Sequence, residues 1–163
     1  MTKTIKKATA VFIAAIITVV SLCVTAFAVG TGDYTVNTEA GTKGTTVIIE
    51  YSNVSNDFSR VSGPNDYGSY LNTFKTGSAT TYTLSFTPSI GAATTVSFCD
   101  QDSTNEIGRI TIPKWSSGMP STLTTTVTLR SNYYYAIKMK SNSSTINASG
   151  TLRIDGLAGV YYM

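Results

Sequence analysis

Apolar residues recur at every second position through most of this 163-residue chain, from residue 44 onward. A period of two is that of a half-buried β-strand, whose side chains alternate between core and solvent. With a short strand at Tyr34–Thr38, about eight strands are expected. The seven alternating segments are Thr45–Tyr51, Thr80–Thr87, Thr94–Cys99, Ile107–Ile112, Thr122–Arg130, Tyr133–Lys140 and Ser149–Asp155.

The rest of the pattern favours strands that pair antiparallel. After residue 29, no segment carries the apolar stripe of an amphipathic helix beyond a turn or two, and β-branched residues dominate. The strand-like segments lie about ten residues apart and are separated by Gly, Pro, Asn, Asp and Ser, whereas a parallel sheet needs crossover helices. The sequence therefore predicts an all-β fold, a single antiparallel β-sandwich of the jelly-roll type whose Thr-rich face meets water.

The N-terminal segment has the pattern of a secretory signal peptide. Three lysines form a basic start, an uncharged apolar stretch follows, and Ala26 and Ala28 form an A-x-A cleavage site. We expect residues 1–28 to be a cleaved signal helix and residues 29–163 to be the β-sandwich domain of a secreted, extracellular protein. The alternative is a membrane anchor, because an uncleaved segment 8–28 is long enough to span a bilayer.

The signal segment also accounts for the basic character of the whole chain. Three of the twelve basic residues lie in it and all nine acidic residues follow it, so the remaining charges balance. A neutral chain gives no reason to expect a nucleic-acid partner, or a membrane partner after cleavage. Only Cys99 then remains, which excludes an intramolecular disulfide. With no cation expected nearby, Cys99 is predicted to be an inert thiol near the surface.

The chain contains no histidine, which removes Ser-His-Asp and Cys-His catalysis and the commonest transition-metal ligand. Two carboxylates across a cleft would still suffice to hydrolyse a glycoside, but Glu50 is the sole acid centred in a predicted strand. No catalytic residue and no cofactor are expected, and the protein is predicted not to be an enzyme.

Residues 100–106 offer oxygen ligands at alternate positions, with Asp100 and Asp102 as the candidate metal ligands, in the chemistry that calcium prefers. An EF-hand loop would carry glycine and glutamate where this chain has Asn105 and Thr111. The favoured alternative is a turn in which Asp and Asn side chains accept hydrogen bonds from nearby backbone.

Trp115 is the only tryptophan and lies in a segment bounded by two prolines. A loop tryptophan can stack on a sugar ring or anchor a protein partner, and Tyr67, Tyr70 and Tyr134 are candidate companions in such a ligand-binding site. The alternative is that Trp115 plugs one end of the sandwich.

Two further segments bear on partners and edges. Residues 52–78 lack clean alternation, and either a functional connection or an irregular strand around Tyr70–Lys75 that closes a sheet edge would explain them. The uncharged C-terminal segment Gly159–Met163 predicts an apolar edge that pairs with another chain, and hence self-association.

Three stretches carry a family resemblance. Val96–Asp100 with Ile107-Gly108 looks like a strand, an Asp/Asn turn and a returning strand, Tyr133–Met139 like a late aromatic strand, and Ser149–Ile154 like a closing strand. In these stretches the chain resembles the bacterial pre-peptidase C-terminal domain and related small jelly-roll modules of secreted Gram-positive proteins. The resemblance implies a β-sandwich that assists substrate or surface binding without catalysis, and it assigns no functional residue.

Three functions remain open on this basis. The leading one is a secreted, non-catalytic binding or surface module that recognises a carbohydrate, cell-wall or protein partner through loop aromatics. The second is a bacteriocin-like or toxin-like effector. The third is a small glycoside hydrolase, which would need a cleft that holds Glu50 with another acid.

Overall fold

The computed structural model describes residues 32–41, 43–61, 72–101 and 105–162, and in these residues it contains strands but no helix. The strands are β1 (Asp33–Gly41), β2 (Gly44–Val54), β3 (Ser59–Arg60), β4 (Asn72–Lys75), β5 (Thr81–Phe86), β6 (Thr94–Asp100), β7 (Glu106–Ile112), β8 (Leu123–Thr128), β9 (Tyr134–Ser141), β10 (Ala148–Leu157) and β11 (Gly159–Tyr162).

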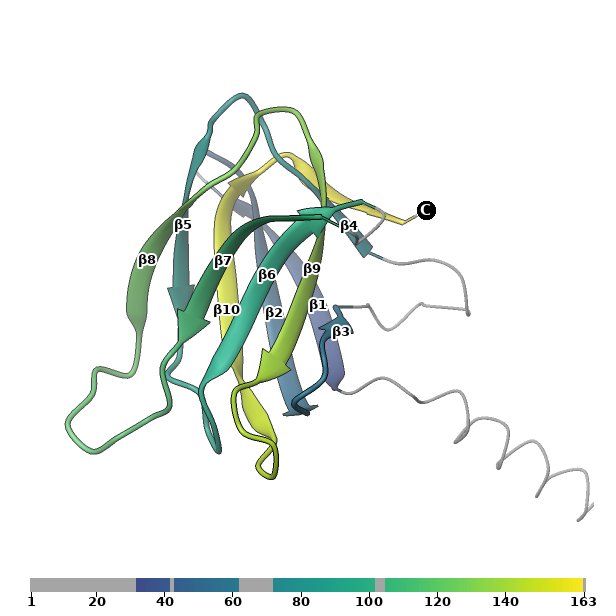
Figure 1. The fold of residues 1–163 in the computed structure, drawn as a ribbon. Helices are drawn as coiled ribbons and strands as arrows, with labels where there is room; N and C mark the ends of the chain where they lie inside the picture. The colour runs from purple at the N-terminus through teal and green to yellow at the C-terminus, as the bar shows by residue number, and fades with distance from the viewer. Residues whose placement is uncertain (1–31, 42, 62–71, 102–104, 163) are drawn as a thin grey trace, which may run out of the picture. The chain divides into compact units, whose positions relative to one another are not determined.

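These strands form two antiparallel sheets. The first has the order β1-β2-β10-β5-β8, and the second has the order β11-β4-β9-β6-β7 with β3 paired to β9. Figure 1 shows the two sheets stacked as layers, with β7, β6 and β9 in front of β8, β5, β10 and β2. The chain crosses between the sheets after β2, β4, β5, β7, β8, β9 and β10, as in a jelly roll. The predicted all-β antiparallel sandwich is confirmed.

Each of the eight predicted strands corresponds to one observed strand. The sequence pattern gave no clear signal for β3, β4 and β11, because two to four residues are too few for an alternation to show. The irregular strand expected around Tyr70–Lys75 is present as β4, but the prediction that it closes a sheet edge is wrong. Strand β11 pairs with it from Gly159–Lys75 to Tyr162–Asn72 and takes the edge position itself. Self-association through that edge stays a prediction.

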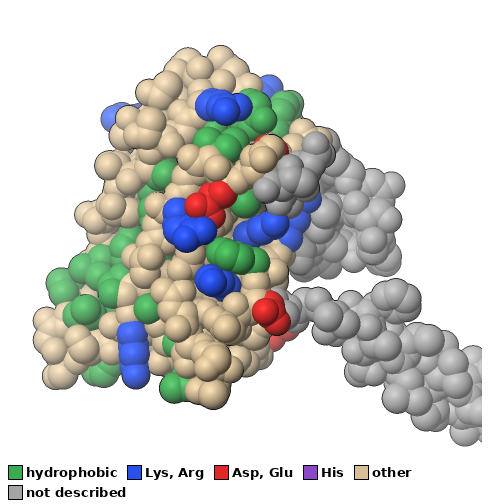
Figure 2. Space-filling view, viewed as in Figure 1, with side chains coloured by type: hydrophobic (Ala, Val, Ile, Leu, Met, Phe, Trp, Pro, Cys, Tyr) green, Lys and Arg blue, Asp and Glu red, His purple; other side chains and the backbone are tan. Residues whose placement is uncertain are grey.

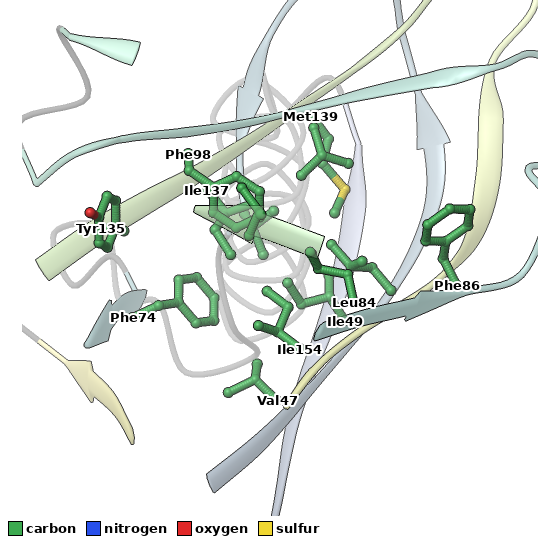
Figure 3. Close-up of a cluster of buried hydrophobic side chains, with 14 of the residues drawn as sticks. Val47, Ile49, Phe74, Leu84, Phe86, Phe98, Tyr135, Ile137, Met139 and Ile154 are labelled. Carbon is green, nitrogen blue, oxygen red and sulfur yellow. The ribbon is translucent and has the colours of Figure 1, made fainter. Parts of the chain in front are cut away.

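The core lies between the two sheets and is built by the alternating residues. Figure 3 shows Ile49, Leu84 and Ile154 of the first sheet packed with Phe98 and Ile137 of the second. All five side chains are at most 1 % exposed. Burying an aliphatic or aromatic side chain contributes about 1.5 to 3 kcal/mol each, so this contact between the sheets provides much of the stability.

The outer face of the first sheet is rich in threonine, as the alternation predicts. On β5, Tyr82, Leu84 and Phe86 are buried while Thr81 and Thr83 between them are exposed. Strand β8 repeats this pattern beside β5 with three exposed threonines. One face of this sheet therefore packs inward and the other meets solvent.

Cys99 corrects the prediction of a thiol near the surface. The residue is buried because β6 lies inside its sheet between β7 and β9, and the outward-facing Ser97 on the same strand is buried too. Burial raises the pKa of the Cys99 thiol, although the positive charge of Lys138 acts to lower it. The expectation that no cation lies nearby is also wrong, because strand pairing places Lys138 beside Ser97.

Several expectations fall on residues outside the described ranges. They concern the signal segment 1–28 with its cleavage residues, the membrane alternative 8–28, Tyr67, Tyr70 and Asp102. Within the described ranges, no helix is long and apolar enough to cross a membrane.

Candidate functional site

Three connections meet at one end of the sandwich, and we call residues 87–93, 113–122 and 142–147 together the loop end. Backbone hydrogen bonds join these segments. The Ser89 amide donates to the Pro113 carbonyl at 2.8 Å, the Trp115 amide donates to the Ser89 carbonyl at 2.8 Å, and the Asn142 amide donates to the Ala93 carbonyl at 2.8 Å. Figure 1 shows these connections below the sheets. The backbone that carries Trp115 is therefore fixed by its neighbours.

Ser89 is the centre of this arrangement. Its side chain is fully buried, and its hydroxyl lies 2.9 Å from the Thr94 hydroxyl. Gly91, two residues further, has a φ of +87°, which favours glycine, and a Cβ there would strike the carbonyl oxygen of Asn147. The loop end thus depends on small residues that allow the three connections to pack closely.

The Trp115 side chain is 55 % exposed, which rules out the alternative that it plugs the sandwich. Two further large apolar side chains of the loop end are exposed, namely Ile90 at 70 % and Ile146 at 48 %. Figure 2 shows hydrophobic side chains on the lower part of the molecule, near the connection between β7 and β8. A fixed backbone that presents several exposed apolar side chains makes the loop end the candidate site of this fold.

A surface pocket of about 560 Å³ lies beside Trp115. Trp115, Ile90 and Pro88 supply apolar walls, and three hydroxyl-bearing residues, Thr87, Ser121 and Thr151, complete the lining together with Gly150. The Thr151 amide donates to the Thr87 hydroxyl oxygen at 3.0 Å, which orients that side chain. The pocket therefore combines an apolar surface with hydrogen-bonding groups and bears no charged side chain.

Gly150 in the pocket lining allows a close approach by Tyr51 from the core side. A Cβ at position 150 would lie 2.6 Å from the Tyr51 hydroxyl oxygen, so any other residue would displace the tyrosine. The Tyr51 side chain is buried, and burial raises the pKa of its hydroxyl. The hydroxyl lies near the Ser89 and Thr94 side chains without meeting the geometry of a hydrogen bond.

Tyr134 lies at the other end of the sandwich from Trp115. The first residue of strand β6 pairs with Ile112, which lies just before the Trp115 segment. The last residue of β6 pairs with Tyr135. Seven residues of strand separate these ends by about 20 Å. The Tyr134 ring packs edge to face with Tyr161, with their centroids 5.6 Å apart, and the Lys75 ammonium lies 5.0 Å from the Tyr134 centroid. The structure thus does not bring together the two predicted aromatic residues that it describes.

Asp100 behaves as the turn alternative predicts. Its two carboxylate oxygens accept hydrogen bonds from Asn105, at 3.2 Å from the backbone amide and at 2.8 Å from the side-chain amide. In the described part of the chain, no group of three His, Cys, Asp or Glu residues is placed to hold a metal ion.

Glu50 does share a shallow depression of about 320 Å³ with another acid, Asp33. Both residues are exposed, and the Asp33 carboxylate accepts a hydrogen bond from the Asn53 side chain at 2.7 Å. A glycosidase acid is shielded from water so that it holds its proton at neutral pH, and this depression provides no such shielding.

Sequence reasoning selected Trp115 but not the rest of its pocket. An isolated isoleucine between Pro88 and Gly91 was an available signal for Ile90, because apolar residues in such a turn-like segment are unusual. Thr87, Ser121 and Thr151 resemble the chain's many other hydroxyl residues, and only the tertiary structure places them beside Trp115.

No family model and no curated protein matches this chain. Solved structures do show similarity, and two of them are carbohydrate-binding modules. One is a carbohydrate-binding module of lichenase 5A from Cellvibrio mixtus in complex with cellotriose, with 16 % identity over 74 % of this chain and 85 % of that chain, at a TM-score of 0.36. The other is the family 11 carbohydrate-binding module of a cellulosomal cellulase of Clostridium thermocellum, with 13 % identity over 77 % and 80 % of the chains, at a TM-score of 0.33.

At these identities and TM-scores, we transfer neither a function nor a residue role from either structure to this chain. The resemblance to the pre-peptidase C-terminal domain has no matching family model and likewise extends no further than the fold.

Proposed function

We propose that this protein is a secreted, non-catalytic binding protein that takes a carbohydrate in the Trp115 pocket. The observation that carries the proposal is the Trp115 side chain, 55 % exposed beside a pocket that also presents hydroxyl groups. A sugar ring has an apolar face of C–H groups and an edge of hydroxyls. An indole face next to Thr87 and Thr151 matches both, because it stacks on one and the hydroxyls bond to the other.

The size of the apolar surface favours a carbohydrate over a protein partner. A stable protein interface buries about 800 Å² on each side, with a core of several aromatic or aliphatic anchors. The loop end offers three exposed large apolar side chains, Trp115, Ile90 and Ile146, and hydroxyl residues interrupt them. Secretion rests on the N-terminal signal pattern.

The test is calorimetric titration of the protein with a panel of soluble neutral and acidic polysaccharides, comparing the natural chain with Trp115→Ala. We expect binding to at least one polysaccharide and its loss in Trp115→Ala. The matched control is Tyr161→Ala, which removes an exposed aromatic side chain on β11, away from the loop end. A panel without any binding, or equal binding by the natural chain and Trp115→Ala, would contradict the proposal.

A further inference from the structure

A ladder of hydroxyl residues runs along the outer face of β5 and β8. Strand pairing sets Thr81 opposite Thr128, Thr83 opposite Thr126 and Ser85 opposite Thr124, and we call these six residues the hydroxyl ladder. All five threonines are exposed and Ser85 is half-buried. The pairs repeat about every 7 Å along the strands, with about 5 Å between the strands. The result is a regular array of hydroxyl groups on one surface.

The ladder hydroxyls are available to a ligand. Among the described residues, none of the six side chains makes a hydrogen bond or ion pair within the protein. Each hydroxyl can donate one hydrogen bond and accept two. The neighbouring strand β10 carries Arg153 and Asp155 opposite Ser85 and Thr83, and these two charges lie 3.4 Å apart as an ion pair. The ladder itself is uncharged.

The ladder continues the Trp115 pocket. Thr87 follows Ser85 along the chain, and its amide donates to the Thr151 carbonyl at 3.1 Å, so the pocket residues extend the same row. Ser121 of the pocket lies just before β8. At the far end, Thr81 and Thr83 line a second depression of about 510 Å³. From Thr87 to Thr81 the row extends for about 20 Å, a length that covers several sugar rings.

We infer that the ligand of the Trp115 pocket is a linear, uncharged polysaccharide whose chain lies along the hydroxyl ladder. This inference rests on the proposed function and names its ligand class. A polysaccharide repeats its hydroxyl groups along its length and can form hydrogen bonds with the repeated hydroxyls of the ladder. A polysaccharide bound only by its end would contact only the pocket. Each hydrogen bond exchanged with water contributes little by itself, so the ladder adds affinity only when several sugar units engage it together.

The experiment measures how affinity depends on the length of the ligand. The probes are neutral cello-, xylo- and manno-oligosaccharides from disaccharide to hexasaccharide, titrated calorimetrically into the natural chain, Thr83→Val/Thr126→Val and Trp115→Ala. Valine keeps the shape and the strand preference of threonine and removes the hydroxyl, so both threonine substitutions preserve the sheet. Thr111→Val, at an exposed position of β7 in the other sheet, is the matched control.

In at least one series, we expect the affinity of the natural chain to rise with oligosaccharide length. The double threonine variant should bind the hexasaccharide about tenfold or more weakly and the disaccharide unchanged, since two hydrogen bonds are lost only in the longer complex. Thr111→Val should bind every length like the natural chain. Trp115→Ala should lose every length.

The outcomes distinguish a failure of this inference from a failure of the proposed function. If affinity does not depend on length, or if the double variant binds the hexasaccharide like the natural chain, the inference is wrong while the Trp115 site stands. If no oligosaccharide or polysaccharide binds the natural chain, both are wrong.

Discussion

Replacing Gly150 by alanine is expected to lower the free energy of unfolding by about 1 to 3 kcal/mol, the usual cost of overpacking a well-packed site. The new Cβ would lie 2.6 Å from the hydroxyl oxygen and 2.9 Å from the ring carbon Cζ of Tyr51, and 3.3 Å from the Thr87 hydroxyl oxygen. The Tyr51 ring is buried at 3 % exposure. It therefore cannot move aside without disturbing the core around it.

The contact with Tyr51 can be isolated by a double-mutant cycle. In the natural background, Tyr51→Phe should be neutral or stabilising, because it removes a buried hydroxyl that makes no hydrogen bond of good geometry. In the Gly150→Ala background, the same change removes the atom at 2.6 Å while the contact at 2.9 Å remains. We expect Tyr51→Phe to recover part of the lost stability, with a coupling energy of about 0.5 kcal/mol or more.

Urea unfolding and scanning calorimetry of the four proteins measure this cycle. A loss of 1 to 3 kcal/mol corresponds to a fall in Tm of about 3 to 10 °C for a domain of this size. Gly77→Ala is the control, since the nearest atom to its Cβ would lie 4.0 Å away. A Gly150→Ala protein as stable as Gly77→Ala, or a cycle without coupling, would show that Tyr51 and Gly150 are not in the contact described.

Two further predictions concern titratable groups. Hydrogen bonds from Arg109 and Ser97 hold the pKa of Glu106 below its usual range, so Glu106→Gln should lower Tm at neutral pH, and the difference should shrink as the pH falls through the pKa of the folded state. A difference that grows in acid would contradict this reasoning. Cys99 is buried and its thiol pKa is raised, so it should react with a thiol reagent slowly in the native protein and rapidly in urea. Equal reaction rates in the native protein and in urea would show that Cys99 is not buried.

The fold could be predicted because alternation is a local property. On β5, three inward residues and the Thr-rich outer positions follow from the order of side chains along one strand, whatever that strand pairs with. Short strands such as β3 and β4 carry too few residues for this signal. The burial of Cys99 was missed for a related reason. A period of two assigns a residue to a face of the sheet, but not to an inner or outer place in the strand order.

The candidate site was only partly predictable. The sequence singled out Trp115 because a tryptophan between two prolines is distinctive, and it left open whether the side chain is exposed. Tyr134 was grouped with Trp115 by residue type, and the structure separates the two by the length of β6.

By itself, the sequence determined the two faces of each long strand, the all-β class and the choice of Trp115 for the proposed site. The tertiary structure decided that Ile90 and Thr151 stand beside Trp115, and that the hydroxyls of β5 and β8 form one ladder leading from this pocket. These neighbours come from segments far apart in the chain, and the order of strands in a sheet sets which of them meet. Strand pairing is a long-range choice made by the packing of the whole sandwich, so no local pattern records it.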